Sequence, residues 1–254
     1  MRCGQRKVPL PDEDAGPIFG KLMKRTSIVF LTAVALLVTA SKRREGDNTY
    51  RWRENIDAVG RVLSLDSTRF LGAGFVVEPF DVMITASHVA ATDTVLFERV
   101  HSRAFDTVTA IVRIPHKDLA VFGPLKKKEP AKFRLGSFEK AQAGDSAIYL
   151  GLEESGTIYR IDAPLTAKGL FQLPGQTVSV DALTIDCNVR HGMSGGPVMN
   201  MQGEVIGVLT GRLLQSPQGG DDSTAVLAVS TDTLATILRN WQSERDSANS
   251  PHER

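Results

Sequence analysis

The sequence predicts an all-β protein built from two barrels with a helix at the end. Short apolar runs recur along the body of the chain, with turn-forming residues between them. Long amphipathic helical patterns do not occur among these runs. The strand pattern is interrupted at residues 123–130, where glycine, two prolines and three lysines follow one another. Many short strands without long helices are typical of barrels. We therefore expect a first barrel over about 55–123 and a second over about 131–230, within one domain spanning 55–242.

Twelve runs have the length and apolar composition of strands. In the first half they are 58–65, 70–77, 82–85, 94–97, 108–114 and 119–122; in the second half they are 146–150, 157–161, 177–185, 197–200, 205–210 and 225–229. After them, apolar residues recur at helical spacing, and Ser230 or Thr231 can cap the helix. We expect a closing helix at 231–241 and a disordered polar tail at 243–254.

The amino-terminal residues have the layout of an export signal. Residues 28–40 carry no charge, follow two basic residues and end in small residues, which is the pattern of a secretory signal peptide. The run is short for a membrane span, which needs about 20 apolar residues. We expect 23–40 to be a signal peptide, with Met23 rather than Met1 as the true initiator. The alternative is an uncleaved anchor.

The segments around this signal are expected to lack a packed structure. Residues 1–22 are interpreted as a disordered or mis-called extension, and the polar residues 41–54 as a linker. The expected location is outside the cytoplasm, either periplasmic or secreted. The alternative is a membrane-anchored protein, held through residues 28–40, with the domain outside the cytoplasm.

Composition excludes several classes of function. The formal net charge of +1 gives no argument for nucleic acid as a partner. Two cysteines, Cys3 and Cys187, cannot form the disulfide framework of a small secreted domain. No Cys-x-x-Cys or His-Glu-x-x-His run indicates a metal site, and no cofactor is expected. The oligomeric state is left open.

The most informative stretch is the run from Gly192 to Pro197, in which Ser194 lies between glycines. A serine hydroxyl needs an adjacent base, and the oxyanion formed by its attack needs hydrogen-bond donors. Glycines let the backbone turn tightly, so the amides of Gly192 and Ser194 are candidates for an oxyanion hole. A plain Gly-Ser turn between two strands is the alternative.

Two upstream motifs supply partners for this serine. His88 follows a predicted strand within Thr-Ala-Ser-His, and Asp118 opens the apolar run Asp-Leu-Ala-Val. A general base and an orienting carboxylate are what a serine nucleophile requires. We rank these two residues above the other candidates on motif context; those are His101, His116, His191, His252, Asp93 and Asp106.

The three motifs together resemble those of chymotrypsin-fold, trypsin-like serine proteases. The chain is most similar to the bacterial HtrA-like branch, also through Ile-Asp at 185–186 and the run 203–208. The resemblance covers roughly residues 55 to 240. It implies two six-stranded antiparallel barrels with a short carboxy-terminal helix, and an exported serine endopeptidase that acts on proteins or peptides. Envelope protein quality control is a candidate role.

The resemblance also implies roles for single residues. His88 would be the general base, Asp118 would orient it, and Ser194 would be the nucleophile. Gly192 and Ser194 would form the oxyanion hole. The primary substrate pocket would be lined by Asn188, Val189, Leu209, Thr210 and Gly211, and it would favour small or medium aliphatic side chains over basic ones.

Met193 departs from the family pattern. Digestive members carry an aspartate here that pairs with a new amino terminus, and HtrA-like members usually carry asparagine. Zymogen activation by that ion pair is therefore not expected, and the shape of the loop at 188–193 decides whether the site is active. A PDZ domain, which often follows in HtrA-like proteins, is not expected. The alternative function is a latent or non-enzymatic module that binds proteins or acts as a chaperone.

Overall fold

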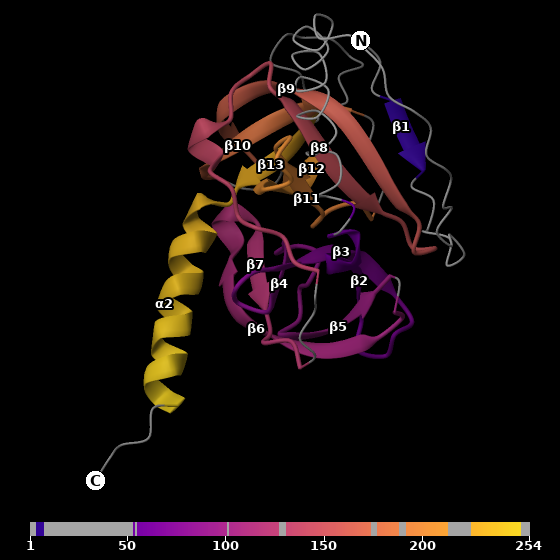
Figure 1. Cartoon of the computed structure of the whole chain (residues 1–254), viewed down its shortest axis with the longest axis vertical. Helices are drawn as coiled ribbons and strands as arrows, with labels where there is room; N and C mark the ends of the chain where they lie inside the picture. The colour runs from indigo at the N-terminus through magenta and orange to yellow at the C-terminus, as the bar shows by residue number, and fades with distance from the viewer. Residues whose placement is uncertain are drawn as a thin grey trace, which may run out of the picture.

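The computed structural model describes residues 4–7, 53, 55–100, 102–126, 131–173, 177–187, 192–212 and 225–249. The first half folds into a closed barrel in the order β2-β3-β4-β7-β6-β5, in which all neighbours are antiparallel (Figure 1). Its strands are β2 (Val59–Leu63), β3 (Phe70–Val77), β4 (Val82–Ala86), β5 (Thr94–Arg99), β6 (Phe105–Ile114) and β7 (Leu119–Phe122). Two 3-10 turns, η1 (Ile56–Ala58) and η2 (Pro115–Lys117), precede β2 and β7.

The second half forms a second antiparallel barrel. The strand order is β9-β10-β13-β12-β11-β8, and a β9–β8 pairing closes the ring. The strands are β8 (Ser146–Leu152), β9 (Ile158–Gln172), β10 (Ser179–Asp186), β11 (Pro197–Met199), β12 (Val205–Arg212) and β13 (Ala225–Ser230); the 3-10 turn η3 (Phe138–Lys140) precedes them. The predicted fold class is therefore confirmed.

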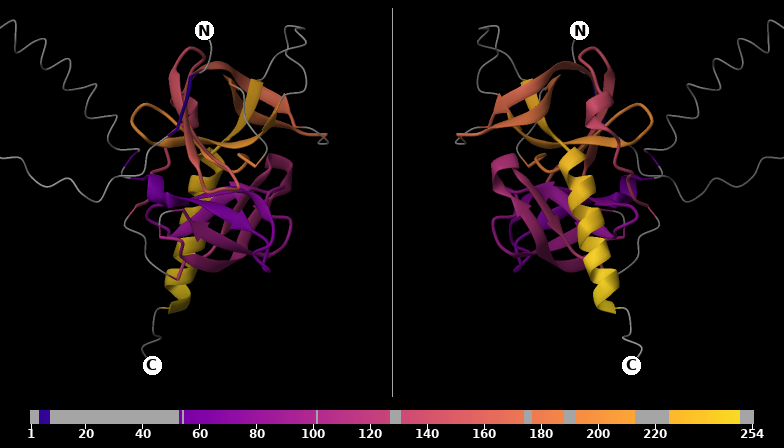
Figure 2. Two further views of the ribbon diagram at one scale, coloured as in Figure 1. Left: turned by 90° about the vertical axis from the view of Figure 1, so that its right-hand side faces the viewer. Right: turned by 90° about the vertical axis from the view of Figure 1, so that its left-hand side faces the viewer.

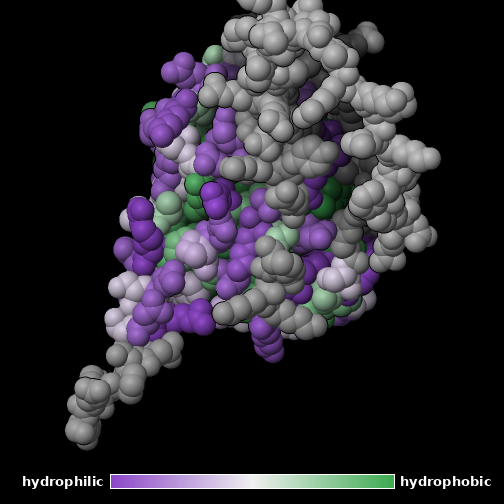
Figure 3. All heavy atoms as spheres, viewed as in Figure 1, coloured by the Kyte–Doolittle hydropathy of each residue, from purple (hydrophilic) through white to green (hydrophobic). Residues whose placement is uncertain are grey.

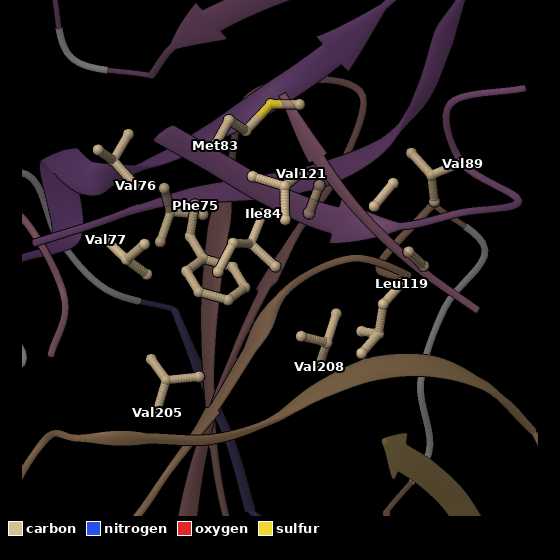
Figure 4. Packing of buried hydrophobic residues seen from close by; sticks show 14 of the residues in the cluster. Phe75, Val76, Val77, Met83, Ile84, Val89, Leu119, Val121, Val205 and Val208 are labelled. Carbon is tan, nitrogen blue, oxygen red and sulfur yellow. The ribbon is translucent and has the colours of Figure 1, made fainter. Parts of the chain in front are cut away.

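The apolar cores of the two barrels are continuous. Val205 and Val208 of β12 lie opposite Phe75, Ile84 and Leu119 of the first barrel (Figure 4). All five side chains are fully buried, and burying one such side chain stabilises the fold by about 1.5–3 kcal/mol. This shared core holds the barrels in a fixed relation, so loops from both can meet at one site.

Helix α2 (Asp232–Asn249) follows the second barrel but runs along the first (Figures 1 and 2). Its apolar side chains Leu234 and Leu238 are fully buried, and Ile237 and Trp241 pack against the same core. The exposed side is polar (Figure 3). Ser230 Oγ accepts a hydrogen bond from the amide of Asp232 at 3.2 Å, consistent with the expected capping role.

The helix is longer than the sequence predicted. Residues 243–249, expected to be disordered, continue α2 to Asn249. Extending an existing helix avoids the unfavourable nucleation step, and the Arg245 guanidinium lies 5.5 Å from the Trp241 ring centroid, a cation–π contact across one turn. Residues 250–254 lie outside the described residues.

Two further strands differ from the prediction. Strand β9 runs from Ile158 to Gln172 instead of ending near 161, because at Pro164 and Leu165 it changes partner from β8 to β10. Residues 4–7, part of the expected disordered extension, form β1 (Gly4–Lys7), which pairs antiparallel with the edge of β9. Nearly all of the predicted signal and linker, and residues 127–130 between the barrels, lie outside the described residues.

No helix in the described part of the chain is both long and apolar enough to cross a membrane. The described residues also contain no group of three or more His, Cys, Asp or Glu side chains placed to hold a metal ion. Cys187 is buried and makes no disulfide.

Candidate active site

His88 and Asp118 form the hydrogen-bonded pair that the motifs predict. The carboxylate oxygen Oδ2 of Asp118 lies 2.7 Å from His88 Nδ1. The second oxygen, Oδ1, accepts a hydrogen bond from the backbone amide of His88 at 2.9 Å. Both carboxylate oxygens therefore act on one residue, which fixes the imidazole and leaves its Nε2 as the atom able to accept a proton.

Asp118 is held in place by its backbone. It ends η2 in a left-handed conformation with φ 51° and ψ 39°, which is uncommon for a non-glycine residue. Its amide donates to Pro115 O at 3.0 Å, and its carbonyl accepts from the amide of Ser87 at 3.0 Å. The side chain is 14% exposed against 48% for His88. The carboxylate is thus partly shielded from water, while the imidazole faces it.

The loop that carries Ser194 is attached to both barrels. The amide of Gly195 donates to Leu209 O at 2.7 Å, and the amide of Leu209 donates to Gly196 O at 3.0 Å. From the first barrel, the amide of Ala73 donates to Ser194 O at 2.8 Å. The nucleophile candidate therefore lies where the second barrel meets β3.

The contacts of Gly72 place Ser194 close to the residue that follows His88. A Cβ built on Gly72 would lie 2.8 Å from Val89 and 2.9 Å from Ser194 O. Ser194 Oγ makes no hydrogen bond to His88 or to any other described residue. Catalytic hydrogen bonds are often long in unliganded structures and shorten with substrate. The three motif residues therefore converge on one region, with the histidine–aspartate pair already formed.

Two backbone amides of the serine loop are unpaired within the part of the chain that the structure describes. Those of Gly192 and Ser194 donate no hydrogen bond within the described residues, whereas those of Gly195 and Gly196 do. Gly192 has φ 91°, and a Cβ on it would lie 2.5 Å from the Phe70 ring, so only glycine fits this conformation and contact. Unpaired amides on neighbouring residues are what an oxyanion hole requires.

The other candidates have different surroundings. Asp106 is buried and forms an ion pair with Arg99 at 2.5 Å, so its charge is already neutralised. Asp93 is 88% exposed at its side chain, and His116 is exposed on η2. His101, His191 and His252 lie outside the described residues.

The predicted substrate pocket is only partly described. Asn188 and Val189 lie outside the described residues. Leu209 and Thr210 are buried, and a Cβ on Gly211 would meet no atom within 4 Å. The backbone of Leu209 supports the serine loop, as described above, and its side chain packs in the core of the second barrel.

A cavity that the motifs did not reveal lies beside His88. It has a volume of about 650 Å³ and extends between the β2–β3 turn and the segment after β4. Its lining is formed by Ser64, Leu65, Arg69, Phe70, Leu71, His88, Val89, Ala91 and Thr92. Apart from His88, its lining comes from the β2–β3 turn, the start of β3 and the segment after β4. These segments carry no recognisable motif, so sequence reasoning missed the cavity.

The chain belongs to the trypsin-like peptidase domain family, whose model matches residues 72–208, more than half of the 254 residues. At the level of the family this confirms the expected enzyme class, the serine-type endopeptidases. The chain is 27% identical over 207 residues to a probable periplasmic serine endoprotease DegP-like of Rhizobium meliloti (strain 1021). That alignment covers 78% of this chain and 38% of the relative, so the chain spans less than two-fifths of its length.

Solved structures share the fold at low identity. The active form of the Rv3671c protease from M. tuberculosis has a TM-score of 0.60 at 22% identity, with 87% of this chain and 93% of that chain covered. The HtrA-type protease AlgW, solved with a decapeptide, has a TM-score of 0.61 at 19% identity, with 77% of this chain and 66% of that chain covered. These likenesses support the two-barrel architecture.

Proposed function

We propose that this protein hydrolyses peptide bonds in proteins or peptides through His88, Asp118 and Ser194. The observation that carries the proposal is the two-point contact of the Asp118 carboxylate with His88. It is made near the loop of Ser194, in which the amides of Gly192 and Ser194 donate no hydrogen bond to any residue that the structure describes. A hydrogen-bonded pair that served stability alone would not need an imidazole that is 48% exposed.

The chemistry follows from these positions. Ser194 Oγ would attack the carbonyl carbon of the substrate while its proton passes to His88 Nε2. Asp118 would stabilise the imidazolium, and the amides of Gly192 and Ser194 would bind the oxyanion. Cleavage of the carbon–nitrogen bond releases the amine with the proton from His88. Water, deprotonated by His88, then attacks the acyl-enzyme and frees the acid and Ser194.

The comparisons support peptides as the substrate class and export as the location. AlgW was solved with a decapeptide, and the relative from Rhizobium meliloti is described as periplasmic. We propose an exported enzyme, with a role in envelope protein quality control. The alternative location is a protein anchored through residues 28–40, with the domain outside the cytoplasm.

We also propose that the primary pocket takes a small or medium aliphatic side chain. Asn188 supplies no carboxylate for a basic side chain, and apolar pockets discriminate mainly by size. Profiling with a library of peptides is expected to show cleavage after Val, Ala or Leu. Strong cleavage after Arg or Glu would overturn this specificity.

The activated serine is tested with a fluorophosphonate probe followed by peptide mass spectrometry. We expect stoichiometric labelling at Ser194, lost in Ser194→Ala and in His88→Ala, because the nucleophile needs its base. His116→Ala is the matched control, an exposed histidine on η2, and it should label like the wild type.

The second candidate function is a latent module of the same fold that binds proteins. In such a module the hydrogen bond that Ser194 Oγ lacks within the described residues would not form with a substrate either. A folded, monodisperse wild type that is not labelled would support latency and reject the proposed activity.

A further inference from the structure

The residue that precedes the nucleophile is uncharged, and its side chain is buried. Met193 is 1% exposed and belongs to the core of the second barrel. Its thioether lies against Gly151 of β8, where an added Cβ would be 2.8 Å from Met193 Sδ. The absence of a side chain at Gly151 therefore makes room for the side chain of Met193.

The backbone of Met193 is held by the same face of the same strand. Tyr149 lies two residues before Gly151, and residues two apart in a strand share a face. Its hydroxyl donates a hydrogen bond to Met193 O at 2.6 Å. The amide of Gly196 donates to the same oxygen at 3.3 Å. Tyr149 is 1% exposed, so this hydrogen bond is shielded from water.

The geometry of the peptide links this hydrogen bond to the site. Met193 O and the amide of Ser194 belong to one peptide unit, which is planar and trans, so the carbonyl and the N–H point in opposite directions. Fixing the oxygen toward Tyr149 fixes the Ser194 N–H away from it. A flip of this peptide would break the Tyr149 hydrogen bond and turn the N–H inward.

We propose that Tyr149 is a positioning residue that orients the Ser194 amide toward the oxyanion, with Met193 seated on Gly151 as its apolar anchor. The proposal rests on the proposed function. Tyr149 touches no reacting atom and acts through the Met193–Ser194 peptide. A neutral hydrogen bond and an apolar side chain would then take the place of the ion pair that Met193 cannot form.

The phenol is suited to this role because it stays protonated. Burial raises the pKa of Tyr149 well above its ordinary value of 10.0, and the nearby Cys187 raises it further. Tyr149 therefore remains a hydrogen-bond donor throughout the neutral range, and the orientation of the peptide does not depend on pH there.

The test compares the wild type with Tyr149→Phe, which removes one hydroxyl and keeps the ring. Two measurements are made: the rate constant of fluorophosphonate labelling, and the affinity for a tripeptide boronic acid ending in a valine side chain. The boronate adduct places an oxygen in the oxyanion hole. The same tripeptide as a carboxamide forms no adduct and reports ordinary binding.

We expect Tyr149→Phe to lower the labelling rate constant and the boronate affinity together by about ten-fold or more, toward the 10²–10³-fold loss that follows removal of an oxyanion donor. Carboxamide affinity should be unchanged. Tyr159→Phe is the matched control, because its hydroxyl hydrogen-bonds Glu153 at 3.2 Å in the same barrel and it should behave like the wild type in all three measurements.

Gly151→Ala provides a second test that removes no hydrogen bond. Its Cβ would press on the Met193 thioether and should also slow labelling; it decides the question if Tyr149→Phe does not fold. Labelling at the wild-type rate in the folded variants, or equal losses of boronate and carboxamide affinity, would overturn the role of Tyr149. A wild type that is not labelled would overturn the proposed function together with it.

Discussion

Asp118→Asn is expected to lower kcat by about 10⁴-fold while the protein stays folded. The carboxylate contacts His88 at two points, Nδ1 at 2.7 Å and the backbone amide at 2.9 Å. An asparagine keeps one acceptor but presents an NH₂ group where an oxygen is needed. If the asparagine oxygen faces Nδ1, the hydrogen bond from the backbone amide of His88 is lost. If the NH₂ group faces Nδ1, the imidazole is held in the wrong tautomer, with the proton on Nε2, and it cannot accept the serine proton.

Turnover of a fluorogenic peptide chosen from the library profile measures this loss, and the thermal midpoint checks the fold. Asp93→Asn is the matched control, because Asp93 is another aspartate of the same barrel and its side chain is 88% exposed. It should retain wild-type turnover. If Asp118→Asn kept more than a tenth of the wild-type kcat, Asp118 would not be the orienting carboxylate.

The barrel strands could be predicted where period-two alternation or a continuous apolar run marked them. The sequence prediction ends this strand at 161, before Pro164 and Gly169, although positions 161, 163 and 165 are buried and 162, 164 and 166 are exposed. Pro164 is tolerated where the strand changes partner, since a missing donor matters least at such an irregular position. The alternation was the signal that could have extended the prediction.

The predicted site residues share a property that sequence can show. His88 follows the end of β4 and Asp118 precedes the start of β7, each within a short motif, and Ser194 lies in a glycine-rich turn. No sequence motif indicates the contact between Tyr149 and Met193. It joins residues 44 positions apart through a backbone carbonyl, which every residue type carries, so only the folded chain reveals it.

Gly195→Ala is expected to lower the free energy of unfolding by about 2–5 kcal/mol, a large share of the 5–15 kcal/mol typical of a domain, and to abolish labelling of Ser194. Two costs add at this position. Gly195 has φ 89°, which L residues rarely adopt, and a Cβ would lie under 3.0 Å from Ala73 O and Thr85 Oγ1. Thr85 Oγ1 itself donates to Ala73 O at 2.7 Å, so neither atom can move without breaking that hydrogen bond.

Gly144→Ala separates these two costs. Gly144 has nearly the same dihedral, φ 94°, but nothing lies within 4 Å of its Cβ position. It should therefore show only the backbone term, about 1–2 kcal/mol, with Ser194 labelled as in the wild type. Urea unfolding of both variants gives the comparison. Equal losses of stability would mean that the close approach of β3 to the serine loop does not restrict Gly195, whereas a larger loss at Gly195 would show that the first barrel positions the nucleophile carried by the second.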